Sequence, residues 1–399
     1  MSTPLNSERS LRGQAAVVGL GQSTYYKHGK SPDSEFKLVL KAVLDACRDA
    51  DIDPRRIDGF ASYSDDRNEA SRLATALGVQ RMRYANMVWG GGGAGMAAAV
   101  GNAAAAVACG MAECVVVYRG LAQGQFKRFG RAPNAPTVAG DKAFESPYGV
   151  ISMGQKAALR TQRFMQDHGI HQSALRAISL AAYEHAQRNP RAIMNGRPLT
   201  AQAYDESRWI VEPFHLFDCC MENDGAAAVI VVPAERVDDF PHPPAYLLGC
   251  ASGQEYRATA AAYNAPVFAT GGFEAVAGDL YRMARLSPGE VDVVQVYDHF
   301  TGGAMMSLVE HGFFSGEQAN DFLQPDNLIA PGGKLPINTS GGNLAECYMH
   351  GMGLLIEGVR QVRGTSTAQA RRSDISMVIA GSMAMPVSTL ILGSQAALK

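Results

Sequence analysis

The stretch "PGEVDVVQVY", residues 288–297, decides the fold because an earlier stretch of the chain repeats its pattern. In "PRRIDGFASY", residues 54–63, a proline is followed by an aspartate four residues later and by a tyrosine five residues after that, as in 288–297. Both stretches end in a short, mostly apolar run of the length of a buried strand. This spacing indicates that the chain contains two diverged copies of one structural unit.

Two further pairs of segments support the repeat. "AAVVGLGQS" from Ala15 matches "AYLLGCASG" from Ala245, and "ECVVVYRG", ending at Gly120, matches "ISMVIAGS" around Gly381. Each half follows the order strand, helix, strand, glycine-rich turn, helix, strand. Such alternation predicts an α/β fold in which helices cover a largely parallel sheet.

The two halves meet near "DDFPHPPAY", where two acids and three prolines interrupt any regular element. We therefore place the first unit at residues 1–240 and the second at residues 241–399. Residues from about 121 to 213 have no counterpart in the second half, so we predict that they form an inserted cap. Its expected helices are "GQKAALRTQRFMQDHG" (154–169) and "ALRAISLAAYEHAQRNP" (174–190).

The composition narrows the classes of function. With 399 residues, 47% of them hydrophobic, and a net charge of -2, the chain is globular and has no electrostatic signal for nucleic acid or acidic membranes. Its seven cysteines include no C-x-x-C pair, which argues against a disulfide framework or a zinc site. The N-terminus lacks an apolar signal core, and the longest apolar run, "AGMAAAVGNAAAAVACGM", predicts a tightly packed buried helix rather than a membrane span. We expect a cytoplasmic protein with reduced thiols.

Two glycine motifs resemble nucleotide-binding loops but are incomplete. "GLGQST" from Gly19 lacks the third glycine of a dinucleotide fingerprint, since Thr24 stands there. "WGGGGAG", from Trp89 to Gly95, is not followed by the Gly-Lys-Ser/Thr of a phosphate-binding loop. Four glycines before a helix expose backbone N–H groups to a ligand, although a tight strand-to-helix turn explains the same pattern.

Three motifs, in this order, resemble the thiolase superfamily and its sterol-carrier and lipid-transfer-type branch. They are "CCMENDGAAAVIV" from Cys219, "DVVQVYDHF" from Asp292 and "NTSGGNLAECYMHGMG" from Asn338. With the repeat and the cap, the resemblance covers nearly the whole chain. It implies a five-layered αβαβα domain built from two halves, with the active site where loops of both halves meet.

The sequence departs from the thiolase pattern at the catalytic positions. In thiolases one loop carries the nucleophilic cysteine. When this loop is aligned on Asn86, Gly90 stands at the position of the cysteine, so no acyl-enzyme is expected. The histidine that activates the nucleophile falls on Tyr348, and the Asn or His of a second motif falls on Tyr297. The second cysteine of the family is missing from "MVIAGSM".

This replacement is similar to the steroid side-chain-cleaving aldolases of the superfamily. The resemblance implies that Tyr297 and Tyr348 catalyse retro-aldol cleavage of a β-hydroxyacyl-CoA, specifically of a 17-hydroxy steroid C-20 carboxyl-CoA to a 17-ketosteroid and propionyl-CoA. CoA is part of the substrate, and no cofactor or metal is expected. A phenol, which titrates near pH 10, donates a proton readily at pH 7 but acts as a base only if its pKa is lowered or its partner takes up charge. Which tyrosine is the acid and which the base stays open.

Neighbouring groups are candidates for supporting roles. Backbone N–H groups of the loops at Gly90 and Gly381 are expected to face the enolate oxygen. Asp298 and His299 follow Tyr297, and because adjacent side chains at a strand end point oppositely, we expect one of them to be structural. His350, two residues after Tyr348, is a candidate for supporting the tyrosine.

The expected partners come from the same reasoning. We expect a homodimer in which the N-terminal half, including the alanine-rich stretch from Ala94, builds the contact, because small residues let backbones approach closely and a symmetric copy covers an unpaired sheet edge. The resemblance implies a second partner that contains an OB fold and a zinc ribbon. Two alternatives remain: a non-catalytic lipid or acyl-CoA carrier, and an acyltransferase that uses a displaced cysteine such as Cys347.

Overall fold

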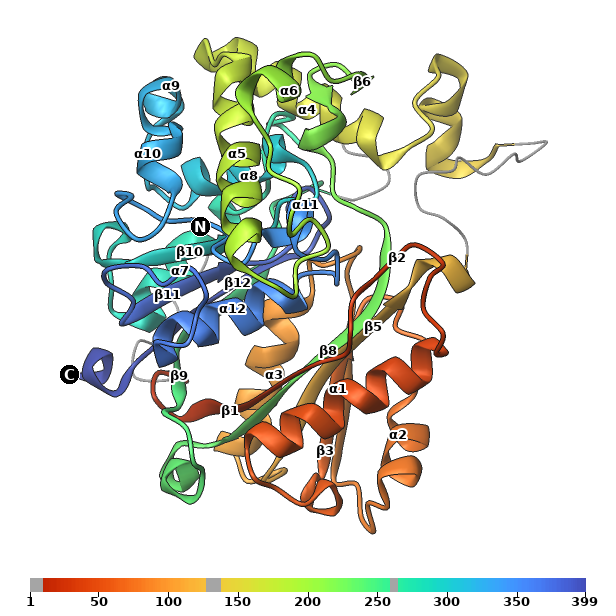
Figure 1. Ribbon diagram of the computed structural model, residues 1–399, viewed down its shortest axis with the longest axis vertical. Helices are drawn as coiled ribbons and strands as arrows, with labels where there is room; N and C mark the ends of the chain where they lie inside the picture. The colour runs from red at the N-terminus through yellow and green to blue at the C-terminus, as the bar shows by residue number, and fades with distance from the viewer. Residues whose placement is uncertain (1–9, 127–137, 259–264) are drawn as a thin grey trace.

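The computed structural model describes residues 10–126, 138–258 and 265–399, and its centre is one mixed β-sheet (Figure 1). The strand order is β10-β11-β12-β9-β1-β8-β5-β3-β4, with β2 beside β8. The bounds are β1 (Ala15–Gln22), β2 (Tyr26–Lys27), β3 (Gly59–Tyr63), β4 (Tyr84–Val88), β5 (Val115–Ala122), β8 (Asn223–Pro233), β9 (Ala245–Gly253), β10 (Val293–Val296), β11 (Ile375–Ile379) and β12 (Val387–Gly393). Strands β6 (Trp209–Val211) and β7 (Phe214–His215) form a separate pair.

Helices cover the sheet and form the cap. They are α1 (Glu35–Asp49), α2 (Ala70–Leu77), α3 (Met96–Ala108), α4 (Met153–His168), α5 (Gln172–Arg188), α6 (Ala201–Asp205), α7 (Glu274–Ala284), α8 (Thr301–Glu310), α9 (Ala319–Phe322), α10 (Pro325–Leu328), α11 (Gly342–Ala345) and α12 (Met352–Arg363). Within the described ranges, no helix combines the length and the apolar composition that crossing a membrane requires.

The predicted repeat is confirmed in the sheet. Strand β3 runs parallel to β5, and its counterpart β10 runs parallel to β11. The aspartate of the repeat explains part of the shared pattern: Asp58 accepts a hydrogen bond from the backbone N–H of Cys114 at 2.9 Å, and Asp292 accepts one from that of Ile375 at 3.0 Å. Each carboxylate therefore ties the start of one strand to the next. The two halves join where β1 pairs with β9, and the boundary at residues 240 and 241 stays a prediction.

The prediction of a largely parallel sheet is wrong. Strands β8 and β12 run antiparallel to both of their neighbours, β5 and β1 for β8 and β11 and β9 for β12. A parallel neighbour requires a crossover connection, whereas β12 follows β11 after a short loop and β8 enters the sheet from the cap. Apolar composition did not reveal this, because a strand buried on both faces reads as a continuous apolar run in either direction.

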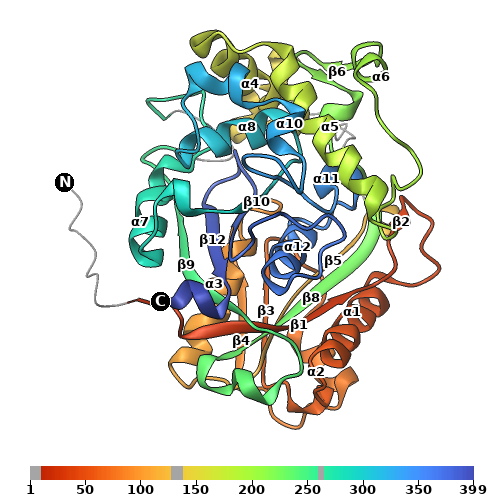
Figure 2. The same cartoon turned by 60° about the vertical axis from the view of Figure 1, so that its left-hand side comes forward.

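The layers agree with the five-layered αβαβα prediction. Helices α3 and α12 each contact strands of both halves and lie at the centre of the molecule (Figure 2). Helix α1 contacts β1, β5 and β8 on one outer face, and α7 contacts β9 and β12 on the other. The order is therefore α1, first half of the sheet, α3 with α12, second half, α7.

Helix α3 is the tightly packed buried helix that its alanines and glycines predicted. A Cβ at Gly101 would lie 2.6 Å from Sγ of Cys250 in β9, so only a glycine allows this approach. Most residues of α3 are buried against strands of the same chain. The expectation that the alanine-rich stretch from Ala94 builds a dimer contact is therefore wrong, because the two halves of one chain already cover it.

The cap packs over the second half of the chain. Its predicted helices are confirmed as α4 and α5, which contact α8, α10 and α11 and lie beside them at the top of Figure 1. The Thr301 hydroxyl, at the start of α8, donates a hydrogen bond of 2.7 Å to Asp218, in the segment that follows the cap. Residues 127–137 of the predicted insertion lie outside the described residues.

Candidate active site

The structure brings Tyr297 and Tyr348 together. The Tyr297 hydroxyl donates a hydrogen bond of 2.9 Å to the Tyr348 hydroxyl oxygen, and the two rings meet edge to face with their centroids 6.1 Å apart. Tyr297 follows β10, and Tyr348 lies between α11 and α12. Both side chains are buried. Two phenols 51 residues apart in sequence therefore form one contact, and their catalytic role stays a prediction.

The backbone around each tyrosine is held firmly. The Tyr297 N–H donates to the Ile379 carbonyl at the end of β11. Asn223, the first residue of β8, binds both backbone groups of Tyr348: it accepts from the N–H at 2.7 Å and donates to the carbonyl at 3.2 Å. Asn223 was not among the predicted site residues. The signal that marks it is a fully buried asparagine at the head of an apolar strand.

The glycine-rich loop packs directly against this pair. A Cβ at Gly93 would lie 2.1 Å from the Tyr297 ring, and a Cβ at Gly92 would lie 3.9 Å from the Tyr297 hydroxyl and 4.0 Å from that of Tyr348. A Cβ at Gly90 would instead meet the carbonyl of Pro386 at 3.8 Å. A side chain at Gly92 would therefore face the tyrosines, whereas one at Gly90 would not. The sequence alignment places the nucleophile position at Gly90, two residues earlier.

The two glycine loops differ in their available N–H groups. The Gly381 N–H donates to the Gly93 carbonyl at 3.2 Å, so it is already used within the protein. The N–H of Gly381 itself is therefore not available to a substrate oxygen, and the role of the Gly381 loop stays a prediction. Within the described ranges, the N–H groups of Gly92 and Gly93 donate to no protein acceptor. They replace Gly381 as candidate donors.

Asp298 and His299 point to different surroundings, as expected for adjacent residues. The Asp298 carboxylate accepts from the backbone N–H of Asn343 at 2.8 Å and of Leu344 at 3.4 Å, so it caps α11. Burial raises the pKa of Asp298 to about 7. The His299 ring lies 5.0 Å from the Tyr297 ring, and burial lowers the pKa of His299 to about 3. Asp298 is thus the structural member of the two.

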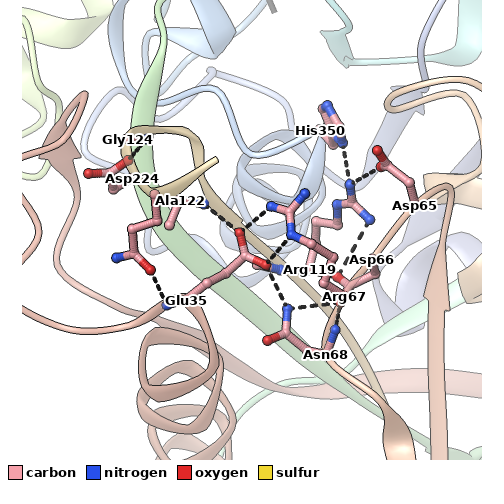
Figure 3. Close-up of polar contacts among 12 residues, drawn as sticks. Glu35, Asp65, Asp66, Arg67, Asn68, Arg119, Ala122, Gly124, Asp224 and His350 are labelled. Carbon is pink, nitrogen blue, oxygen red and sulfur yellow. Dashed lines mark hydrogen bonds and ion pairs between the residues drawn. The ribbon is translucent and has the colours of Figure 1, made fainter. Parts of the chain in front are cut away.

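His350 contacts a buried arginine that sequence reasoning missed (Figure 3). Nη2 of Arg119 lies 2.9 Å from Nδ1 of His350 and 2.8 Å from Oδ1 of Asp65, and Nη1 donates to the Tyr63 carbonyl at 2.7 Å. The Tyr63 hydroxyl donates to the His350 carbonyl at 2.8 Å. The signal for Arg119 is a basic residue inside β5, whose residues are all buried. Lysine and arginine are almost never fully buried unless they are paired.

Burial sets the protonation of the reactive groups. It raises the pKa of both Tyr297 and Tyr348 above the usual phenol value, so both are neutral near pH 7. It also raises the pKa of the Cys347 thiol well above its usual range. Because the thiolate is the nucleophilic form, Cys347 is a poor nucleophile. Its Sγ instead accepts a hydrogen bond of 2.9 Å from Asn223.

Comparison with known proteins places this geometry in a family. The thiolase C-terminal domain-like family matches residues 255–394. The chain is 37% identical over 390 residues to the 17-hydroxy-3-oxo-4-pregnene-20-carboxyl-CoA lyase of Mycobacterium tuberculosis, which covers 96% of this chain and 100% of that one. It is 36% identical over 391 residues to the steroid side-chain-cleaving aldolase of Thermomonospora curvata, with 96% and 99% covered.

Solved structures agree. The Ltp2-ChsH2(DUF35) aldolase superposes with a TM-score of 0.88 at 36% identity, over 97% of this chain and 99% of that one. Human mitochondrial 3-ketoacyl-CoA thiolase, at 14% identity, has the same fold with a TM-score of 0.69 over 97% of this chain and 100% of that one. The resemblance inferred from the three motifs is confirmed. The chain belongs to the steroid side-chain-cleaving aldolases of the thiolase superfamily.

Proposed function

We propose that this protein is a carbon–carbon lyase that cleaves a β-hydroxyacyl-CoA by a retro-aldol reaction. Its proposed substrate is a 17-hydroxy steroid C-20 carboxyl-CoA, and the products are a 17-ketosteroid and propionyl-CoA. The names of the two relatives, which match the chain over nearly its full length, support this substrate class. The observation that carries the proposal is the contact of 2.9 Å between the hydroxyls of Tyr297 and Tyr348, at the positions where thiolases have other catalytic residues.

The tyrosine pair suits a proton relay between neutral phenols. The substrate β-hydroxyl donates its proton to the Tyr297 oxygen, Tyr297 passes its own proton to Tyr348, and Tyr348 protonates the α-carbon. The bond between the α- and β-carbons breaks, and its electron pair forms the thioester enolate before the α-carbon is protonated. The hydroxyl proton is thereby balanced by the new C–H bond. Neither phenol has to ionise beforehand, in keeping with the raised pKa of both.

The enolate oxygen requires hydrogen-bond donors in fixed positions. The N–H groups of Gly92 and Gly93 fit this role, because they lie beside the tyrosines and donate to no acceptor of the described protein. A cysteine side chain at Gly92 would occupy the space in front of the two hydroxyls, so its absence leaves room for the reacting carbons. In this scheme CoA is part of the substrate and no further cofactor takes part.

We also propose that the enzyme is a cytoplasmic homodimer that works with a second protein containing an OB fold and a zinc ribbon. Strand β4 is one of the two edges of the sheet and belongs to the first half, and Trp89, directly after it, is 90% exposed, so a second copy is best placed against β4. The related solved structure carries two components in its name, Ltp2 and ChsH2(DUF35), which supports a partner for this chain.

The decisive experiment measures cleavage by mass spectrometry. The purified protein, alone and with a co-expressed partner, is incubated with the steroidal β-hydroxyacyl-CoA. We expect stoichiometric release of the 17-ketosteroid and propionyl-CoA, with no acyl group on the protein. A carrier would return the substrate intact, and an acyltransferase would show a thioester on a cysteine. Either result would overturn the lyase assignment.

A further inference from the structure

We infer that His350 is a neutral hydrogen-bond donor to the thioester oxygen in the retro-aldol step, and that Arg119 is the positioning residue that fixes it in the donor tautomer. This inference rests on the proposed function, since it assigns a role within the same site. It adds two residues to the proposed mechanism. The side chain of His350 donates a hydrogen bond to the oxyanion, and the buried Arg119 acts only by orienting His350.

The tautomer follows from the contact between the two residues. A guanidinium group carries only hydrogen-bond donors and stays protonated in proteins. Nδ1 of His350, 2.9 Å from Nη2 of Arg119, must therefore accept the hydrogen bond. A neutral imidazole that accepts at Nδ1 carries its proton at Nε2. Arg119 thus makes Nε2–H the donor end of the ring.

The donor end of the ring points to the tyrosines. A Cβ at Gly92 would lie 4.0 Å from Nε2 of His350, at nearly the same distance as from the two tyrosine hydroxyls. Three polar groups, two from the loop between α11 and α12 and one from the end of β10, therefore converge on the side-chain position that Gly92 leaves empty. In the proposed relay the two hydroxyls move protons. Nε2–H is then the group suited to the oxygen that gains negative charge.

The environment keeps the imidazole neutral. Burial, and next the positive charge of Arg119, hold the pKa of His350 well below its usual value, while Asp65 acts in the opposite direction. The charge of Arg67 also lowers it. A neutral imidazole is a weak acid, so it stabilises an enolate through a hydrogen bond without delivering its proton to the oxygen. Protonation of the substrate is thus left to the tyrosines.

The first half of the chain holds this arrangement in place (Figure 3). Arg119 is buried between Asp65, at 2.8 Å, and Asp66, at 3.5 Å, which compensate its charge. His350 has a φ of +49°, a backbone conformation that costs energy for a residue other than glycine. The Tyr63 hydroxyl bonds its carbonyl and keeps it there. The ring is therefore oriented before any substrate binds, which is what an oxyanion donor requires.

A matched pair of substitutions tests the donor. In His350→Gln the amide nitrogen can donate from nearly the position of Nε2, whereas His350→Leu has no donor, and neither residue is β-branched at this strained position. We expect His350→Leu to lose about 10²–10³-fold in kcat with little change in KM, and His350→Gln to stay within about tenfold of the wild type. Equal kcat in the two variants, or wild-type kcat in His350→Leu, overturns the donor role.

The tautomer can be measured directly, without turnover. In the full-length protein labelled with ¹⁵N-histidine, the His350 signals are those missing from the His350→Gln spectrum among the nine histidines. We expect a protonated Nε2 and a bare Nδ1 between about pH 6 and pH 8. In Arg119→Met, which cannot donate, the two tautomers should mix. Arg119→Lys should restore part of the preference.

Arg67→Met is the control, because Arg67 lies beside this cluster, is partly exposed, and bonds Glu35 instead of His350. It should leave the tautomer and kcat unchanged. An Nδ1–H tautomer or an imidazolium in the wild type at pH 7 overturns the inference. Failure of the proposed function looks different: the wild type would cleave no substrate, whereas failure of this inference alone leaves a tyrosine-dependent lyase that ignores His350→Leu.

Discussion

Tyr63 and Tyr297 occupy the same position in the two copies of the repeat, and both phenols reach the loop between α11 and α12. The Tyr63 hydroxyl bonds the His350 carbonyl at 2.8 Å, and the Tyr297 hydroxyl bonds the Tyr348 hydroxyl at 2.9 Å. One phenol therefore supports the backbone of the loop, and the other contacts the side chain of Tyr348. Both halves of the chain thus contribute a tyrosine to the candidate active site at this loop.

Removing either hydroxyl of the pair should abolish most of the turnover while the fold persists. Tyr297→Phe and Tyr348→Phe keep the ring packing but interrupt the proton relay, so each should lower kcat by about 10²–10⁴-fold. Because both act in one chain of proton transfers, the double variant should lose far less than the product of the two losses. Steady-state kinetics with circular dichroism checks this. Wild-type turnover in both single variants would remove the tyrosines from the mechanism.

Asn223→Ala should impair both stability and catalysis. The substitution deletes the hydrogen bonds to both backbone groups of Tyr348 and leaves buried polar groups without partners, at a cost of about 1–3 kcal/mol for an unsatisfied group. Since Tyr348 then loses its orientation, kcat should fall by a larger factor than KM rises. Thermal unfolding and kinetics on the same samples test this.

Asn327→Ala is the control for this prediction. Asn327 also donates to backbone carbonyls, those of Asp321 and Phe322, but lies in α10. This variant should lose stability and keep kcat. If Asn223→Ala behaved in the same way, the asparagine would support only the fold.

The repeat was recognisable in the sequence because its three marker residues have separate physical roles. Pro54 and Pro288 each begin a short 3₁₀ turn, the aspartates bond the start of the neighbouring strand, and the tyrosines are the last residue of β3 and the residue directly after β10. The cap helices were recognisable from their length and amphipathic pattern. The direction of β8 was not, because its residues are all buried and their pattern is the same in both directions.

Only the parts of the candidate site that lie within a single sequence motif could be predicted from the sequence. Tyr297 and Tyr348 stand in segments that carry the family pattern. The contacts of His350 with Arg119 and Tyr63 join residues 231 and 287 positions apart, and no local pattern encodes such a pair. Gly92 was missed for a similar reason: four consecutive glycines offer no register, and only the backbone conformation decides which of them faces the tyrosines.

The pKa of Asp298 predicts a specific dependence of stability on pH. Burial raises this pKa from its unfolded value near 4 to about 7 in the folded protein. Below about pH 4 the carboxyl is protonated in both the folded and the unfolded state. Between about pH 4 and pH 7 only the folded state retains the proton. Raising the pH through this range therefore lowers the free energy of unfolding by up to about 1.4 kcal/mol per pH unit. Asp298→Asn cannot ionise and lacks this loss.

Denaturant titrations of the wild type and Asp298→Asn at several pH values test the prediction. The variant should gain stability relative to the wild type as the pH rises from about 4 to about 7, and the difference should then level off. The comparison isolates Asp298 because both proteins share all other titrating groups. A difference that does not change with pH would mean that Asp298 is ionised throughout this range.

Gly92→Ala should separate folding from activity. Its Cβ would lie 3.9 Å from the Tyr297 hydroxyl and 4.0 Å from the Tyr348 hydroxyl, so it meets no protein atom too closely but occupies the space proposed for the reacting carbons. The φ of +51° adds a strain of roughly 1 kcal/mol, which a protein of this size tolerates. We expect a folded variant with at least a tenfold loss of kcat/KM.

Neighbouring glycines supply the controls for Gly92→Ala. In Gly91→Ala the new methyl contacts Ala384 at 3.2 Å, away from the tyrosines, so activity should be largely retained. In Gly93→Ala it would lie 2.1 Å from the Tyr297 ring, so the protein itself should be destabilised. Gly90→Cys should not restore thiolase activity, because its side chain would not face the tyrosines and Tyr348 is a poor base for activating a thiol. Equal activity of Gly91→Ala and Gly92→Ala would show that the substrate does not react beside Gly92, and the site would then have to be sought elsewhere around the tyrosine pair.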